Sequence, residues 1–144
     1  MMKSRLLAGF LAVCFSACEP AADYKTVRKE VVDEHDKVML DSERALENRD
    51  RLERFLLKLD SVKQVKPALD TMKVRKELQT LNKKLNSADL EMETWMKEFD
   101  AELGDKSNSE AVAYFNGEKE KLRKMDTLFQ KLLTESGEYL RRLR

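Results

Sequence analysis

The residues best suited to specific chemistry are the single histidine, several methionines and the single tryptophan of this 144-residue chain. Met92, Trp95 and Met96 fall within little more than one helical turn, near the end of a regular apolar pattern that begins at Val74, and we expect all three to face inward. Thioether sulfurs and an imidazole suit Cu(I) or Ag(I), and an indole ring can cover such an ion through a cation–π contact. The residue types therefore make a soft-metal site the first chemistry to consider.

The expected turns of the chain indicate which residues lie at the same height. We expect a turn centred near residues 65 and 66. Two residues at the same height on the helices before and after this turn then have residue numbers that add up to about 131. By this rule His35 faces Met96, and Met39 faces Met92. His35 also lies on the apolar stripe of its own segment, so we expect its ring to point inward.

A second turn, over residues 104–107, brings the chain back past the same place. It puts Phe115 at the level of Met96. It also puts Glu118 on the inward side, as a hydrogen-bond partner for His35. Two interpretations remain open: these side chains fill core space, because methionine packs well against aromatic rings, or they bind a metal. The metal hypothesis has His35, Met39, Met92 and Met96 as ligands of Cu(I) or Ag(I), with Trp95, Glu118 and Phe115 in support.

Two short segments also carry a family resemblance. His35-Asp36-Lys37-Val38-Met39 and Met92-Glu93-Thr94-Trp95-Met96, followed by Phe99, resemble two recurrent motifs of small uncharacterised Bacteroidota lipoproteins that are often labelled "viral A-type inclusion protein". Leu40 and Glu93 stand where that family often has a proline and a methionine. The likeness covers most of the chain after its leader. It implies a lipid-anchored helical bundle and no particular activity.

Composition and spacing predict that long helices position these residues. Charged residues make up 38% of the chain, while four glycines and two prolines leave few turns, which is typical of solvated helices rather than of a β protein. Apolar residues recur at steps of three and four in three segments, separated by Pro67 and Gly104. The expected helices span 24–63, 67–103 and 108–143.

The fold class that follows is all-α. Short turns force successive helices to run antiparallel, so we expect residues 24–144 to form an up-down-up three-helix bundle. The last helix begins with a capping-box pattern at Ser107 and Glu110. A continuous coiled-coil oligomer is the alternative, because apolar residues of the first segment also repeat every seven positions. Pro67 and Gly104 favour the bundle, since they fall where hairpins need turns.

The first residues of the chain have the layout of a bacterial lipoprotein leader. Two basic residues precede a short apolar run, and Phe15-Ser16-Ala17-Cys18 is similar to a lipobox, in which the cysteine thiol accepts a lipid. An ordinary secretory signal is the alternative. We expect residues 1–17 to be removed, Cys18 to be lipidated, and residues 18–23 to form a short tether to a membrane.

Charge and residue types narrow the functions that we expect. With 28 basic and 27 acidic residues, the chain has no net charge that would attract nucleic acid. The histidine has no serine or thiol nucleophile evident beside it, and the Glu-x-x-His pairs of di-iron bundles are absent from the sequence, so we expect no enzyme activity. We expect a non-enzymatic, lipid-anchored protein that binds or scaffolds a protein partner at the bacterial cell envelope, periplasm-facing or surface-exposed. Binding of Cu(I) or Ag(I) is the alternative function.

Overall fold

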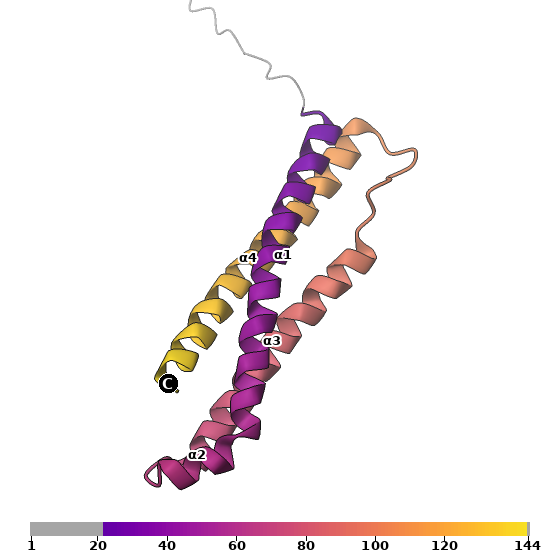
Figure 1. The fold of residues 1–144 in the computed structure, drawn as a ribbon. Helices are drawn as coiled ribbons and strands as arrows, with labels where there is room; N and C mark the ends of the chain where they lie inside the picture. Colours follow the sequence, from indigo (N-terminus) through magenta and orange to yellow (C-terminus); the bar gives the residue numbers. More distant parts are fainter. Residues whose placement is uncertain (1–21, 144) are drawn as a thin grey trace, which may run out of the picture.

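The computed structural model describes residues 22–143 of the chain. These residues are 85% helical and contain no strand, so the predicted all-α class is confirmed. None of their helices is both long enough and apolar enough to cross a membrane. The helices are α1 (Tyr24–Leu57), α2 (Leu59–Val65), α3 (Thr71–Glu98) and α4 (Asn108–Arg142) (Figure 1).

α1 and α4 lie side by side and run in the same direction (Figure 1). At their first residues the backbone N–H of Tyr24 donates to Asn108 Oδ1 at 3.0 Å. Farther along, Asn48 Nδ2 donates to Ser136 Oγ at 2.8 Å. The partners are 84 residues apart in the first pair and 88 in the second, so the two helices stay close to one register over this length.

α3 runs in the opposite direction to α1. Arg49 Nη1 on α1 donates to Asn86 Oδ1 on α3 at 3.1 Å. Nearer the turn, Arg75 Nη2 on α3 pairs with Asp60 Oδ1 on α2 at 3.1 Å. Residue numbers therefore rise along α1 in the direction in which they fall along α3. This antiparallel arrangement brings the segments around His35 and Trp95 to the same end of the molecule.

The interior is a column of apolar side chains from α1, α3 and α4, and α1 packs more extensively on α4 than on α3. Each helix contributes positions three and four apart, as the apolar spacing predicts. The buried members are Val27, Val31, Val38, Ala45 and Leu52 from α1, Leu78, Leu81, Leu85, Ala88, Met92 and Trp95 from α3, and Ala111, Phe115, Leu122, Met125, Phe129, Leu132 and Tyr139 from α4.

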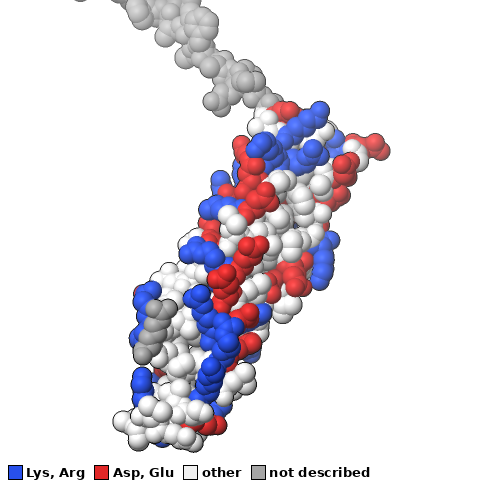
Figure 2. Space-filling view, in the orientation of Figure 1, with Lys and Arg blue, Asp and Glu red and all other residues white. Residues whose placement is uncertain are grey.

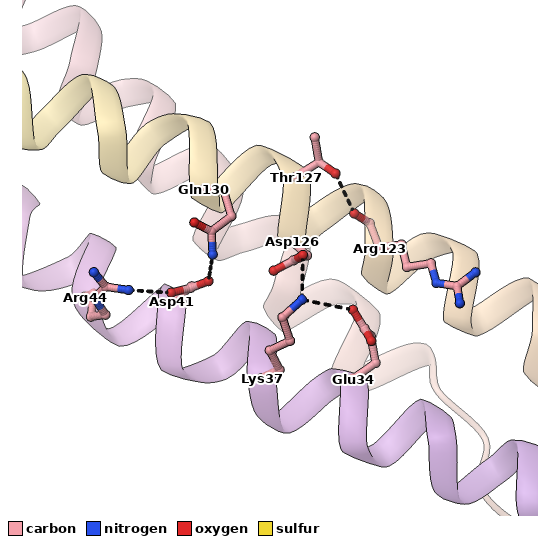
Figure 3. A network of polar contacts seen from close by, with 8 residues as sticks. All are labelled: Glu34, Lys37, Asp41, Arg44, Arg123, Asp126, Thr127 and Gln130. Atoms are coloured by element: carbon pink, nitrogen blue, oxygen red, sulfur yellow. Dashed lines mark hydrogen bonds and ion pairs between the residues drawn. The ribbon is translucent and has the colours of Figure 1, made fainter.

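Polar side chains join α1 and α4 along the same interface (Figure 3). Asp41 is 6% exposed, and its carboxylate accepts hydrogen bonds from Arg44 Nη1 at 2.9 Å and from Gln130 Nε2 of α4. One turn earlier, Lys37 Nζ donates to Asp126 Oδ2 at 2.8 Å, and this hydrogen bond raises the pKa of Lys37. Sliding one helix along the other would remove the Gln130 hydrogen bond from a buried carboxylate and separate Lys37 from Asp126, so these pairs favour a single register.

The helix expected over 24–63 is interrupted after Leu57. Lys58 has φ −96° and ψ 1°, and its N–H bonds to the carbonyl of Phe55 at 3.0 Å, which tightens the last turn of α1. The chain then continues as α2, whose first residue, Leu59, is fully buried. The sequence did not predict this interruption, because the apolar spacing continues through it and neither proline nor glycine marks the position.

α3 begins later than the helix expected from residue 67. Asp70 supplies the N-cap, because its Oδ1 accepts the N–H of Lys73 at 3.0 Å. The preceding turn is held by Lys63, whose Nζ donates to the carbonyl oxygens of Pro67 at 2.6 Å and Leu69 at 2.7 Å. Pro67 therefore lies within the turn, and the first helical residue is Thr71.

α3 also ends at Glu98, five residues before the expected end at 103. Phe99 is extended, with φ −67° and ψ 121°, so the helix does not reach Gly104. Gly104 has φ +59° in the following loop, a conformation that glycine adopts without strain. Ser107 then begins the predicted capping box with Glu110, which is confirmed.

The expected leader over 1–17 and the lipidation site Cys18 lie outside the described residues, as does most of the expected tether over 18–23. Directly after them, Asp23 Oδ1 accepts the N–H of Lys25 at 3.3 Å and caps α1. Asn108 Nδ2 donates to the carbonyl of Ala22 at 2.9 Å. The described chain therefore starts at the end of the molecule where α1 and α4 both begin (Figure 1).

Candidate functional site

Aromatic rings from α1, α3 and α4 stack toward the end of the molecule where α1 and α4 begin. The ring centroids of His35 and Trp95 are 5.5 Å apart and those of Trp95 and Phe99 are 4.8 Å apart, with interplanar angles of 28° and 23°. Phe99 also approaches Tyr114 at 6.4 Å and Phe115 at 6.2 Å. Each such pair contributes about 0.5–1.5 kcal/mol beyond the area that it buries. The stack therefore joins all three long helices.

The indole of Trp95 is fixed by a buried hydrogen bond. Its Nε1–H donates to Glu118 Oε2 on α4 at 2.8 Å, and the two residues are 6% and 5% exposed. The other carboxylate oxygen of Glu118 accepts from Lys121 Nζ at 2.9 Å, and this hydrogen bond raises the pKa of Lys121. A buried carboxylate needs such partners, because an unpaired charge in the interior is costly. Glu118 is therefore satisfied within the interface of α3 and α4.

His35 lies at the predicted end of the molecule but does not bind Glu118. Its side chain is 25% exposed, and its Nδ1 lies 3.0 Å from Asp36 Oδ1. The predicted hydrogen bond between His35 and Glu118 is therefore wrong. The reason is that the buried indole N–H of Trp95 must find an acceptor, whereas an imidazole at the edge of the core reaches Asp36 and solvent.

The methionines of the metal hypothesis lie in different environments. Met92 is 1% exposed inside the core, Met39 is partly buried against it, and Met96 is 41% exposed. The expectation that Met96 faces inward is therefore wrong. Its neighbour Trp95 takes the inward position, and successive residues of a helix point about 100° apart. The structure separates one interior thioether from one that faces solvent.

This arrangement favours packing over metal coordination. The hypothesis needs an imidazole and the thioethers to converge on one point. Instead Met96 is open to solvent, and Nδ1 of His35 is already engaged with Asp36. Over residues 22–143 there is also no cluster of three or more His, Cys, Asp or Glu side chains that could hold a metal ion. Phe115, which the hypothesis placed in support, is fully buried in the core.

Tyr114 belongs to this cluster, although the apolar spacing did not select it. Its Oη accepts the backbone N–H of Asp100 at 2.8 Å, and so fixes the chain just after α3 ends. Its ring also packs edge-on against Phe115 at 5.3 Å. The signal in the sequence was weak, because Tyr114 precedes Phe115 and so falls beside the inward stripe rather than on it.

Comparison with known proteins adds no assignment to this geometry. The chain matches no protein-family model, no curated protein and no solved structure.

Proposed function

We propose that this chain is a non-enzymatic, lipid-anchored helical bundle that binds or scaffolds proteins at the bacterial cell envelope. Cys18 carries the lipid in this proposal, and the membrane is its first partner. α1 with α2, then α3, then α4 form the three arms of an up-down-up bundle beyond a short tether. The resemblance of residues 35–39 and 92–96 to motifs of Bacteroidota lipoproteins supports the same reading.

The observation that carries the proposal is the buried hydrogen bond from Trp95 to Glu118. This hydrogen bond gives Trp95, the single tryptophan of the chain, a structural role, which is to join α3 to α4. A catalytic site needs an open position for its substrate. This pair is 6% and 5% exposed, so it offers none. Partner binding then falls to the outer surface of the bundle.

The shape of the described chain suits a scaffold. α1 has 34 residues, which correspond to about 51 Å at 1.5 Å per residue. The hydrogen bond between Asn108 and Ala22 keeps the start of the described chain at one end of this length. A lipid at Cys18 would therefore leave the long axis free to extend from a membrane into the periplasm or the cell exterior.

The anchor is tested by metabolic labelling of cells with a fatty-acid probe. The wild-type chain should be labelled, and Cys18→Ala should not. Cys14→Ala is the matched control, because Cys14 lies within the expected leader and should leave labelling unchanged. Equal labelling of Cys18→Ala and wild type would refute the anchor.

The scaffold is tested by photo-crosslinking in living cells. Leu40 and Leu90 are 62% and 60% exposed, so a photoreactive residue at either position faces solvent without disturbing the core. We expect discrete protein adducts in the wild-type background and their loss in Cys18→Ala, where the chain no longer reaches its membrane. Absence of adducts from every exposed position would refute the scaffold proposal.

The copper or silver alternative needs a different arrangement of the same side chains. Met96 would have to turn from solvent toward Met92, and His35 would have to release Asp36. We therefore retain core packing as the proposed role of the cluster. A stoichiometric metal site found by titration would replace core packing as the role of the cluster.

A further inference from the structure

α2 lies at the end of the molecule opposite to the first residues of α1 and α4 (Figure 1), and three large apolar residues of this end are exposed. Leu57, Val65 and Met72 are 86%, 81% and 83% exposed, the highest values among the large hydrophobic residues described. They come from the end of α1, the end of α2 and the start of α3. We call residues 57–73 the distal tip. Because the three most exposed large hydrophobic residues fall within this one segment, the distal tip is a candidate interaction site.

A lysine directly follows each of these apolar residues, giving the pairs Leu57-Lys58, Val65-Lys66 and Met72-Lys73. All three lysines are exposed, and within the described chain none of them takes part in an ion pair. The distal tip therefore presents apolar groups and unpaired positive charges together.

The molecule is charged oppositely at its two ends. Residues 51–77 contain eight Lys or Arg and four Asp or Glu, whereas residues 89–121 contain four and ten. The carboxylates of the tip are engaged, because Asp60 pairs with Arg75 and Asp70 caps α3. In Figure 2 the end at α2 is mostly white and blue. Its free charge is therefore positive.

We propose that the distal tip docks onto a membrane surface rich in anionic phospholipid. At the boundary between headgroups and acyl chains, apolar side chains insert while neighbouring lysines remain at the level of the phosphates. The apolar–lysine pairs supply both parts at three places. The inference is independent of a lipid at Cys18, because it concerns the opposite end of the described chain.

A second copy of the chain is the competing occupant, through its acidic end at residues 89–121. That surface would match the lysines of the tip. It offers less to the apolar side chains, since its exposed residues are mainly charged and only Leu90 and Met96 are exposed large hydrophobics there. A lipid boundary accommodates both the charge and the apolar surface, so we favour the membrane.

The test is co-sedimentation of the full chain with vesicles of phosphatidylcholine alone or mixed with phosphatidylglycerol. One variant combines Lys58→Gln, Lys66→Gln and Lys73→Gln. Each lysine near an anionic surface contributes about fivefold in binding, so this variant should bind the mixed vesicles about a hundredfold more weakly than wild type. Added salt should weaken the wild type more than the variant, because salt screens this attraction.

A second variant combines Leu57→Ser, Val65→Ser and Met72→Ser. It should lose about tenfold or more for each side chain that inserts. The controls carry the same types of substitution at two exposed positions away from the tip. One is Leu40→Ser with Leu90→Ser, and the other is Lys124→Gln with Lys131→Gln.

All variants should keep the wild-type circular dichroism spectrum, because the altered side chains are exposed. Residues 1–21 are identical in every variant, so a difference between variants reports on the tip. Equal binding by wild type and both tip variants would overturn the proposal, as would equal losses in the controls. Wild-type dimers that the tip variants cannot form, together with no preference for anionic vesicles, would make the tip a self-association surface instead.

Discussion

Removing the carboxylate of Glu118 should destabilise the fold through the indole of Trp95. Glu118→Leu leaves the Nε1–H of Trp95, in a residue 6% exposed, without its acceptor. An unsatisfied buried donor costs about 1–3 kcal/mol. Lys121 adds little to this loss, since its side chain is 56% exposed and returns to solvent. Glu118→Gln keeps an oxygen acceptor, so it should cost about 1 kcal/mol less than the leucine variant.

Replacing the indole gives the second half of the same test. Trp95→Ala removes a buried aromatic side chain and should cost about 3–5 kcal/mol. Trp95→Phe keeps most of the volume and removes only the donor. If the hydrogen bond is made as described, Glu118→Leu should cost about 1–2 kcal/mol less in the Trp95→Phe background than in the wild type.

Urea unfolding followed by far-ultraviolet circular dichroism measures these differences without relying on tryptophan fluorescence. The midpoint should shift while the dependence on urea stays constant, and each 1 kcal/mol should lower Tm by about 4 °C. A loss below about 1 kcal/mol in Trp95→Ala would refute the buried position of the ring. Additive costs in the double variant would refute the hydrogen bond.

Three further predictions concern metal, alkali and acid. Titration with Ag(I) should show no stoichiometric site, and a one-equivalent site that quenches tryptophan fluorescence and is lost in Met92→Leu with Met96→Leu would establish the metal alternative. Burial, with a smaller effect of the hydrogen bond to Glu77, raises the pKa of Tyr139 to about 12, above its ordinary value of 10.0. The unfolded chain therefore loses this proton first, and stability should fall by up to about 2 kcal/mol between about pH 10 and 12 in urea titrations, but less so in Tyr139→Phe. Ser107→Ala should cost about 1 kcal/mol. Hydrogen bonds from Ser107 lower the pKa of the Glu110 carboxylate below 4.5, so the part of the cap that this carboxylate supplies is present above pH 4.5 and is lost as pH falls through the folded value. Acid unfolding of Ser107→Ala should therefore show a smaller change in stability over that range.

Apolar spacing predicted the inner face of each long helix well. On α3 the steps of three and four from Leu78 to Trp95 are all buried. A helix must bury a continuous stripe, so the stripe is encoded locally and can be read without knowing the partner. The capping box at Ser107 was equally predictable, because both of its members lie within four residues.

Helix ends were less predictable where tertiary contacts determine them. The early end of α3 at Glu98 accompanies the hydrogen bond from the N–H of Asp100 to Tyr114 Oη, which a distant helix supplies. The interruption of the first helix at Lys58 was also not predictable, because no glycine or proline marks it in the sequence. The orientation of Met96 was not predictable from the spacing either. Met96 lies four residues after buried Met92, yet it is exposed, because the indole of Trp95 takes the core position.

The partners of polar side chains were the hardest feature to predict, and they determine how the helices pair. Reasoning from turns compares helices that follow one another, but α1 packs mainly on α4, which comes last in the chain. Lys37 and Asp126 look like solvent-facing charges in the sequence, yet they meet at 2.8 Å across this interface. An apolar stripe can slide by a turn at little cost, whereas the buried carboxylate of Asp41 cannot leave Gln130 without losing a hydrogen bond. The register of α1 against α4 therefore depends on polar pairs whose members are 89 residues apart, beyond the reach of any local pattern.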